Sequence, residues 1–543
     1  MIKQELTQTA SKKPKIVITG TSGLLGSHIA LDLISRGYTV IGTHSKNRLS
    51  ILGKNTDFLD LCSEKSIEIF LEKNKPDLVI HAAAMTDIDQ AQTQKMLCRF
   101  ANVRSTETIA EYCKKSNTKL IFISTPSVFG KSEISSKEIK INDDKKPINY
   151  YSECKKIAEG IVEKIPRHCI IRLNPFGHSP SSKHLLDWAI SSSLNGDKVS
   201  GYIDSMFNPI FAGNVGKYVH EIIKKDFSGI VHLGCNNKIS KFEFVKTTLR
   251  LHDIRKKVFV SKSAKIKGHS RLRNNFNVLS LKETSRSLDI KFQSFTEEYE
   301  DFLEFKKIGN YSKIRLVESL EEVQSKTWVV IPAKNESKTI EKVIASLVPY
   351  FNNIVVVDDG SSDNTASLAN HSSDSVRVAS TTVNSGYDSA IAAGFSYALA
   401  HKAGYVLTFD ADGQHLVSDA LEMLKNISDC DMVLGVRDTK PRVSEHAFSC
   451  VLYPLKISDP LCGMKLYRTK LLKHASFFDR FKSIGTDLVV HSLSSGYTHK
   501  EVKIRTEKRV DTSRFGRKLV ANFKITNALL RVIRFHWRSV CKI

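Results

Sequence analysis

The sequence predicts an α/β protein built from two separate, mainly parallel sheets. Short β-branched runs alternate with helix-length stretches, first from KIVITG to HCIIRLN and again from TWVVIPAKN to YVLTFDADG. Buried runs separated by helices favour parallel sheets, because a crossover helix is what returns the chain to the same edge. A length of 543 residues, against about 150 for a typical domain, leaves room for two or three cores.

Composition divides the chain into five segments. Residues 1–14 form a polar tail, and residues 15–305 hold the first series of strands and helices. The charged stretch 306–326 has no strand-like apolar run, so we interpret it as a linker. Residues 327–512 hold the second series, and residues 513–543 form a basic C-terminal segment.

Composition also restricts the class of protein. No run of about 18 apolar residues is present to span a bilayer, and the polar N-terminus lacks the apolar stretch of a signal peptide. Ten cysteines occur without a CxxC pair, which predicts reduced thiols in the cytoplasm and no zinc site. The formal charge of +24 favours anionic partners, and a lysine-rich solvated surface is the simpler alternative.

Three glycines, Gly20, Gly23 and Gly26, stand between the first predicted strand and a helix. A side chain there would block the tight turn and the approach of backbone N–H groups to a pyrophosphate at the helix N-terminus. The spacing is GxxGxxG, whereas the dinucleotide fingerprint is GxGxxG. We interpret the segment as the nucleotide turn of a Rossmann-type doubly wound sheet, with a plain glycine-rich turn as the alternative.

The loop after the second strand, GTHSKNR, bears on the choice of coenzyme. It has no acid to hold a ribose 2′-hydroxyl, while Lys46 and Arg48 can pair with a 2′-phosphate. This favours NADP, and NAD stays open because two basic residues are common on any surface loop.

A tyrosine and a lysine, Tyr151 and Lys155, stand four residues apart in NYYSECKKIAEG. On a helix both side chains can lie on one face. A tyrosine that exchanges a proton needs its pKa of about 10 lowered, and a neighbouring ammonium does this by favouring the phenolate. Thr125, at the end of KLIFIST, is expected to hydrogen-bond the substrate oxygen beside the tyrosine.

The order of glycine turn, HAAA strand end, threonine and Tyr-x-x-x-Lys resembles the extended short-chain dehydrogenase/reductase family over residues 15 to about 300. Within that family, FLDLCS, ANVRSTETIA, IIRLNPFG and DSMFNPIFAGNVG are most similar to dTDP-4-dehydrorhamnose reductases and related nucleotide-sugar enzymes. The resemblance implies that Thr125, Tyr151 and Lys155 form a catalytic trio and that Asn102 supports the lysine through a water. It also implies coenzyme contacts at Asp60, beside the adenine, and at Ala82 in HAAA.

One departure from that family limits the reaction. Pro126 and Ser127 follow the threonine, where those reductases usually carry Asp-Tyr and sugar 4,6-dehydratases place the acids that drive elimination. Reduction or epimerisation of a keto sugar is therefore expected, and elimination is not.

Carboxylates mark the predicted strand ends of the second series. Asp410 and Asp412 in TFDADGQH can share a divalent cation, Mg²⁺ or Mn²⁺, that neutralises a leaving nucleoside diphosphate. A nucleobase and ribose pocket at the carboxyl ends of parallel strands would use the neighbouring Pro332, Glu336, Asp358 and Asp359.

This set resembles family 2 glycosyltransferases of the GT-A fold over residues 327 to about 515. NSGYDSAIAAGF, DADGQH, SDPLCGMKLYR and RVDTSRFG are similar to the dolichyl-phosphate mannose synthase branch, although Tyr387-Asp388 stands where that branch has Lys-Gly. The resemblance implies that the Asp-x-Asp pair binds metal and diphosphate, that Gln414 adjoins the donor, and that Arg509 and Arg514 clamp phosphate oxygens.

Two acceptors stay open. A polyprenyl phosphate is anionic at pH 7, with a second pKa of about 6, and needs no general base. A glycan hydroxyl does need one, and Asp487 in SIGTDLVV is the candidate.

The C-terminal segment 513–543 carries basic residues every seven positions beside an apolar stripe that includes Leu530 and Ile533. Such an amphipathic helix can lie on an anionic membrane surface, or can pack on its own domain with a solvated basic edge. Nucleic acid is not expected as a partner, because no nucleic-acid-binding module is recognisable.

The sequence thus predicts a bifunctional cytoplasmic enzyme of surface-glycan assembly, peripheral to the inner face of the plasma membrane if the C-terminal helix binds lipid. Its substrates would be nucleotide sugars, and a homo-oligomer stays open. The alternative is a glycosyltransferase whose Rossmann half is a non-catalytic scaffold.

Overall fold

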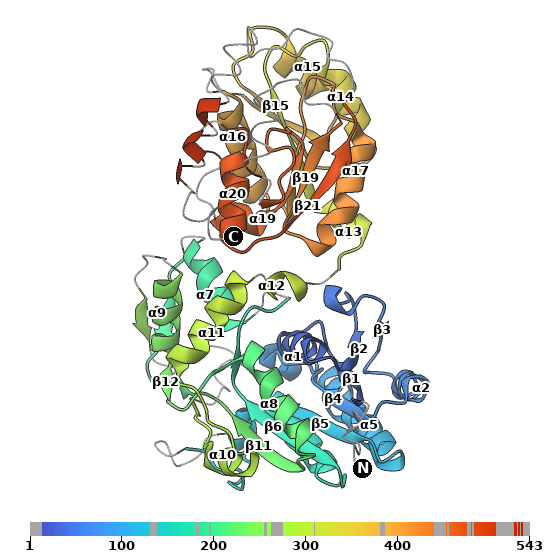
Figure 1. Ribbon diagram of the computed structural model, residues 1–543, viewed down its shortest axis with the longest axis vertical. Helices are drawn as coiled ribbons and strands as arrows, with labels where there is room; N and C mark the ends of the chain where they lie inside the picture. The colour runs from blue at the N-terminus through green and yellow to red at the C-terminus, as the bar shows by residue number, and fades with distance from the viewer. Residues whose placement is uncertain are drawn as a thin grey trace, which may run out of the picture. The chain divides into compact units, whose positions relative to one another are not determined.

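The computed structural model describes most of the chain. The described residues are 13–130, 138–180, 184–194, 197–252, 254, 258–261, 275–308, 310–315, 317–380, 386–438, 452, 455–474, 479, 483–506, 526–528, 530–532, 534 and 535. They fall into two compact units, Met1–Lys306 with Lys313–Leu316, and Lys307–Ser312 with Val317–Ile543 (Figure 1).

The first unit is built on a seven-stranded, fully parallel sheet in the order β11-β6-β5-β4-β1-β2-β3. Its strands are β1 (Lys15–Thr19), β2 (Thr39–His44), β3 (Thr56–Phe58), β4 (Leu78–His81), β5 (Lys119–Ser124), β6 (His168–Leu173) and β11 (Gly229–Leu233). The order reverses at β1, because β2 and β3 extend to one side and β4 onward to the other. The predicted doubly wound Rossmann-type sheet is confirmed.

Helices cover both faces of this sheet. The main ones are α1 (Leu24–Ser35), α2 (Glu64–Asn74), α5 (Ser105–Lys115), α6 (Tyr150–Val162) and α8 (Ala212–Lys224), joined by the shorter α3 (Ile88–Thr93) and α4 (Lys95–Arg99). Helices α1 and α8 pack on each other (Figure 1). Helix α5 packs on α2 and α6. Apolar residues of α2, α5 and α6 share one core with Val17, Val79, Phe122 and Ile170 of the sheet.

A smaller lobe completes the first unit. It comprises β7 (Pro175–Phe176), β8 (Ser200–Tyr202), β9 (Met206–Phe207), β10 (Ile210–Phe211), β12 (Ile239–Ser240), β13 (Phe259–Ser261), β14 (Phe276–Asn277), α7 (Leu185–Leu194), α9 (Lys241–Leu251), α10 (Lys282–Leu288) and α11 (Phe295–Lys307). Its core is aromatic: Phe176 stacks on Tyr299 at 5.7 Å and meets Phe244 edge-on at 5.5 Å between ring centroids. Such pairs add about 0.5–1.5 kcal/mol beyond the area that they bury.

The stretch predicted as a linker contains helices. Helices α12 (Asn310–Lys313) and α13 (Leu320–Ser325) lie within it. The backbone N–H of Ser50 donates to the carbonyl oxygen of Arg315 at 2.7 Å, inside the first unit. Glu318 forms an ion pair with Lys326 at 2.7 Å, inside the second.

The second unit has a mixed seven-stranded sheet in the order β17-β16-β15-β18-β20-β19-β21. Its strands are β15 (Thr327–Ala333), β16 (Ile354–Asp358), β17 (Val376–Ser380), β18 (Tyr405–Thr408), β19 (Met432–Arg437), β20 (Lys465–Arg468) and β21 (His499–Ile504). Strand β20 is antiparallel to both β18 and β19. The mainly parallel α/β sheet predicted for this half is confirmed, and β20 is its one antiparallel strand among the described residues, because the chain re-enters between β18 and β19 in the opposite direction.

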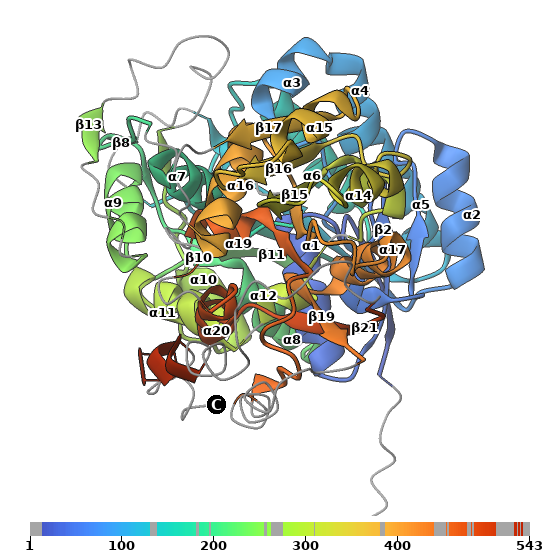
Figure 2. The ribbon, with the colours of Figure 1, turned by 90° about the horizontal axis from the view of Figure 1, so that it is seen from above.

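Helices cover both faces of this sheet as well. One core contains residues of α14 (Ile340–Leu347), α15 (Thr365–His371) and α17 (Val417–Asn426), and the other contains residues of α16 (Tyr387–Ala400), α19 (Thr469–His474) and α20 (Thr486–Ser494). Figure 2 shows β15, β16 and β17 in sequence, with α15 beside β17. The α/β class is confirmed. Because β15, β16 and β18 run parallel, their carboxyl ends lie at one edge of the sheet.

The described part of the C-terminal segment is helical and packs on its own domain. Ala528 and Val532 are buried, and Val532 belongs to the core beneath α16 and α20. Leu530, expected on the apolar stripe, is 56% exposed, so the packed face differs from the predicted one. Among the described residues no helix is long and apolar enough to span a bilayer.

Candidate functional sites

The glycine turn lies at the carboxyl end of β1. Gly20 has φ +72°, and a Cβ there would lie 2.7 Å from the Cα of Ala83. A Cβ on Gly26 would lie 2.3 Å from the carbonyl oxygen of Gly20. Backbone atoms therefore lie too close to Gly20 and Gly26 for either residue to carry a side chain. The N–H groups of the turn, at the start of α1, form an arrangement that fits a pyrophosphate.

Coenzyme-contact candidates surround this turn. Ala82 directly follows β4, the strand that neighbours β1. Lys46 and Arg48 are exposed in the loop after β2, and Arg48 reaches the carbonyl oxygen of Gly53 at 3.4 Å. Asp60 is exposed and accepts the backbone N–H of Cys62 at 2.9 Å. All four lie past the carboxyl ends of β2, β3 or β4, the edge at which doubly wound folds bind nucleotides.

Thr125 and Tyr151 meet at the same edge. Thr125 follows β5, and Tyr151 lies in the first turn of α6, which the side chain of Asn149 caps by accepting the Ser152 N–H at 2.8 Å. The Thr125 hydroxyl lies near enough to Tyr151 to lower the pKa of its phenol. Thr125 Oγ1 also accepts the backbone N–H of Ser127 at 3.2 Å, which holds the threonine side chain in place.

The expected effect of Lys155 on the tyrosine is corrected. Burial raises the pKa of Tyr151, the thiol of Cys98 adds to the rise, and only the Thr125 hydroxyl opposes it. Lys155 instead donates to the carbonyl oxygen of Ile123 at 2.6 Å, with its Nζ 3.8 Å from the ring centroid of Phe122. Burial lowers the pKa of Lys155 to about 7, so its ammonium is lost just above neutral pH.

Asn102 lies in a π-helical turn, Phe100–Arg104, between α4 and α5. Its Oδ1 accepts the N–H of Met85 at 2.7 Å, and its Nδ2 donates to the Met85 carbonyl oxygen at 2.9 Å. The side chain therefore fixes the loop after β4. Single π-helical turns are frequent at functional sites, and support of Lys155 through a water stays a prediction.

A buried ion pair that the sequence analysis missed lies behind Lys155. Glu159 lies one helical turn further along α6. Its carboxylate oxygens accept hydrogen bonds from Nε and Nη2 of Arg172 in β6, at 2.9 and 2.8 Å, and both side chains are fully buried. Ser124 donates to the same carboxylate at 2.5 Å. Burial by itself would raise the pKa of Glu159, but the hydrogen bonds and charge of Arg172 outweigh it and hold that pKa low. Glu159 is therefore an ionised carboxylate whose charge favours the protonated form of Lys155.

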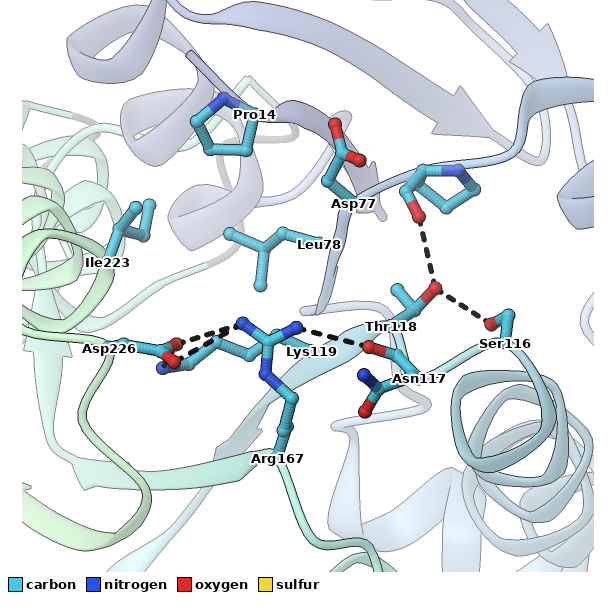
Figure 3. A pocket seen from close by; sticks show the side chains of 11 residues that line it. Pro14, Asp77, Leu78, Ser116, Asn117, Thr118, Lys119, Arg167, Ile223 and Asp226 are labelled. Atoms are coloured by element: carbon cyan, nitrogen blue, oxygen red, sulfur yellow. Dashed lines mark hydrogen bonds and ion pairs between the residues drawn. The ribbon is translucent and has the colours of Figure 1, made fainter. Parts of the chain in front are cut away.

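A cavity of about 350 Å³ lies at the opposite edge of this sheet (Figure 3). Lys119 and Arg167, at the amino ends of β5 and β6, line it and both bind Asp226, at 2.8 and 3.1 Å. Its two cationic groups thus share one carboxylate of the same wall. It lies far from the strand ends that carry the glycine turn and Tyr151, and we do not assign it to the chemistry.

Carboxylates also gather at the strand ends of the second unit. Asp358 ends β16 and accepts the hydroxyl of Ser361, and Asp359 accepts the Gly386 N–H at 2.8 Å. Pro332 is buried in β15. In the loop after that strand, Glu336 receives the hydroxyl of Thr339 at 3.0 Å. The predicted donor-pocket residues therefore share one edge.

Asp410 is held by two hydrogen bonds at that edge. The hydroxyl of Tyr387 donates to Oδ1 at 3.0 Å, and Nε2 of His415 donates to Oδ2 at 3.0 Å. A Cβ on Gly463 would lie 2.3 Å from Oδ2, so only glycine leaves room for the carboxylate. Burial and the charge of Asp410 raise the pKa of Tyr387 well above its ordinary value, which keeps the phenol a donor.

The two carboxylates, Asp410 and Asp412, are suitable ligands for a hard divalent cation. Asp412 is buried and its Oδ1 accepts the N–H of Gln414 at 3.1 Å. Within the part of the chain that the structure describes, no cluster of three or more His, Cys, Asp or Glu side chains could hold a metal by itself. Mg²⁺ is commonly bound by one or two carboxylates together with substrate phosphates and water, and a pair of carboxylates suits that arrangement.

The remaining predicted residues are placed as follows. Asp487 is fully buried in the first turn of α20, and its backbone N–H donates to Ser483 Oγ at 3.1 Å. Its role as a general base stays a prediction. Arg509 and Arg514 lie outside the described residues.

A second ion pair missed in the sequence lies beside the Asp-x-Asp site. Asp459 of the SDPLCG segment receives Nε and Nη2 of Arg437 at 2.8 Å each, at the end of β19. The strand of Arg437, β19, is paired on both sides, with β20 and β21, so the ion pair anchors the segment that leads to Gly463, which lies against Asp410.

Two family models match the chain. The RmlD substrate binding domain covers residues 14–307, and glycosyl transferase family 2 covers residues 328–478. These matches confirm the reductase-like and glycosyltransferase resemblances of the two halves.

Individual proteins match shorter stretches. The probable low-salt glycan biosynthesis reductase Agl14 of Haloferax volcanii is 27% identical over 235 residues, which is 42% of this chain and 76% of that protein. The dTDP-4-dehydrorhamnose reductase of Aggregatibacter actinomycetemcomitans is 23% identical over 215 residues, 40% of this chain and 69% of that protein. A solved dTDP-4-dehydrorhamnose reductase from Bacillus anthracis, in complex with NADP, is 20% identical, covering 53% of this chain and 98% of its own, with a TM-score of 0.48.

Proposed function

Because the chain belongs to the RmlD substrate binding domain family and also carries a family 2 glycosyltransferase domain, we propose that it performs two successive steps of surface-glycan assembly. The first unit reduces or epimerises a nucleotide-bound keto sugar with NADP or NAD. The second unit transfers a glycosyl group, with Mg²⁺ or Mn²⁺, from a nucleotide sugar to a polyprenyl phosphate or a glycan.

In the first unit, NAD(P)H supplies a hydride when it is bound. The glycine turn holds the pyrophosphate, and Lys46 and Arg48 meet a 2′-phosphate if the coenzyme is NADP. Thr125 and Tyr151 would both hydrogen-bond the ketone oxygen. Tyr151 gives its proton to that oxygen, and its raised pKa suits a proton donor at neutral pH.

In the second unit, a divalent cation neutralises the leaving diphosphate when it is bound. Asp410 and Asp412 would hold that cation, while Asp358 and Asp359 hold the nucleoside. A polyprenyl phosphate needs no proton removed before it attacks, whereas a glycan hydroxyl would give its proton to Asp487. Exposed Leu530 and Phe535 flank arginines on the C-terminal helix, which supports contact with an anionic membrane that presents a lipid acceptor.

The observation that supports the reductase half is the placement of Thr125, after β5, and Tyr151, in the first turn of α6, at the strand edge that also bears the glycine turn. One observation favours the alternative, a non-catalytic Rossmann scaffold: Lys155 donates to the Ile123 carbonyl oxygen, and its charge does not lower the pKa of Tyr151.

Deuterium tracing tests both halves. Purified protein is incubated with cell extract, membranes and NADPH deuterated at the transferable hydride, and nucleotide sugars and glycolipids are analysed by mass spectrometry. We expect label in a nucleotide sugar with wild type but not with Tyr151→Phe, and label in a lipid or glycan product with wild type but not with Asp412→Ala. Glycosyl transfer without label supports an epimerase, which returns its hydride internally, or the scaffold. An unlabelled, Tyr151-dependent change of sugar stereochemistry would identify the epimerase.

A further inference from the structure

Side-chain donors hold both oxygens of the Asp410 carboxylate. Both of its oxygens accept a hydrogen bond from a side chain, Tyr387 on Oδ1 and His415 on Oδ2, each at 3.0 Å. Behind it, the absence of a side chain on Gly463 leaves the only room for Oδ2. With two donors on opposite oxygens, the plane of the carboxylate cannot turn without breaking at least one bond.

Tyr387 holds its hydroxyl in place through its own surroundings. It is the first residue of α16, and its ring packs against the core formed by α16, α19 and α20. The residue before it, Gly386, has φ +94° and donates its N–H to Asp359 at 2.8 Å. Two consecutive residues therefore bind the carboxylates that follow two different strands, β16 and β18, on either side of β15.

We propose that Tyr387 is a positioning residue that orients Asp410 toward the divalent cation and ties the cation site to Asp359 of the donor pocket. This inference rests on the proposed metal-dependent glycosyl transfer. A group that hydrogen-bonds a metal ligand sets the direction in which that ligand's remaining lone pairs point, and its loss weakens metal binding even though it never touches the metal.

The chemistry of a phenol suits this position. A neutral hydroxyl orients the carboxylate without placing a second positive charge beside the cation, whereas a lysine ammonium would compete with the cation for the same oxygens. The ring stays anchored in the core, so the hydroxyl is held without the rotamer entropy that a long flexible side chain would lose.

The test compares two tyrosines of the same helix. Tyr387→Phe removes only the hydroxyl on Asp410, while Tyr397→Phe removes a hydroxyl nearly three turns further along α16, where the ring stacks on His401 at 4.3 Å. Binding of Mn²⁺ to each full-length variant is titrated by electron paramagnetic resonance, with Mn²⁺ alone and with UDP or GDP in turn. We expect the Kd for Mn²⁺ to rise about 10- to 100-fold in Y387F and to be unchanged in Y397F.

A third variant separates this inference from the proposed function. Asp412→Asn removes a proposed ligand. If D412N binds Mn²⁺ like wild type, the proposed metal site is wrong and the inference falls with it. If D412N loses Mn²⁺ while Y387F matches Y397F in both Kd and the hyperfine line shape of the bound ion, the site stands and the role of Tyr387 is refuted.

Thermal melting shows whether a variant has lost its fold. We expect Y387F and Y397F to have similar melting temperatures, because both variants keep the aromatic ring. Should Y387F unfold, His415→Leu removes the donor to Oδ2 of the same carboxylate, and an unchanged Kd for Mn²⁺ in a folded H415L would refute the reasoning equally.

Discussion

Replacing Gly26 by alanine tests the glycine turn most directly. The added Cβ would lie 2.3 Å from the carbonyl oxygen and 2.8 Å from the carbonyl carbon of Gly20. Ordinary contacts begin near 3.4 Å, so the turn or the start of α1 must move by about 1 Å. Neither side yields easily, because Gly20 is itself wedged against Ala83 and its oxygen accepts the N–H of Gly23 at 3.0 Å.

The magnitude follows from two opposing effects. Overpacking against backbone costs about 1–3 kcal/mol, and alanine in a helix regains about 0.5–1 kcal/mol relative to glycine. We therefore expect Gly26→Ala to lower the free energy of unfolding by about 1–2 kcal/mol. Displacing one backbone N–H from a pyrophosphate costs a further 1.5–3 kcal/mol of binding, or about 10- to 100-fold in the Kd for NADPH.

Gly160 provides the matched control. It lies in α6, and a Cβ there would meet nothing within 4 Å, so Gly160→Ala is expected to stabilise the protein by about 0.5–1 kcal/mol. Urea unfolding measures the two stabilities, and NADPH fluorescence measures the two affinities. Equal stabilities and equal Kd values in G26A and G160A would refute the reasoning that backbone closes this turn.

Three further predictions concern charge and surface. If the ammonium of Lys155 takes part in hydride transfer, as the family resemblance implies, kcat/KM should fall as the pH rises through about 7, where Lys155 loses its proton, and a profile flat to pH 9 would refute a catalytic ammonium. Arg172→Met leaves the Glu159 carboxylate buried with fewer partners and should cost about 3–5 kcal/mol in urea unfolding, whereas Arg167→Met, at a more exposed pair, should cost about 1 kcal/mol or less. Phe535→Ser should weaken sedimentation with anionic vesicles, and equal binding by wild type and variant would argue against membrane contact through this helix.

Much of the fold could be read from local patterns. Each apolar run quoted from the sequence forms a strand, since burial of β-branched residues in a sheet is encoded within a few positions. The glycine turn and the carboxylates after β16 and β18 were likewise visible, because residues that follow parallel strands reach the same edge whatever the rest of the chain does.

Other features depend on residues distant in sequence. Strand β20 runs against its neighbours although its residues give no sign of direction, because only the path of the chain through the sheet sets it. The exposed Leu530 shows the same limit, since a helical stripe does not say which of its residues will find a core.

The sequence by itself determined which residues could do chemistry: Tyr151, Lys155 and the Asp-x-Asp pair were all named from spacing. Tertiary structure decided how they are tuned. Burial raises the pKa of Tyr151 and lowers that of Lys155, and Tyr387 meets Asp410 across 23 positions. The physical reason is that covalent order fixes side-chain types and short-range geometry, whereas desolvation and hydrogen-bond partners are set by whatever the folded chain brings within a few ångströms.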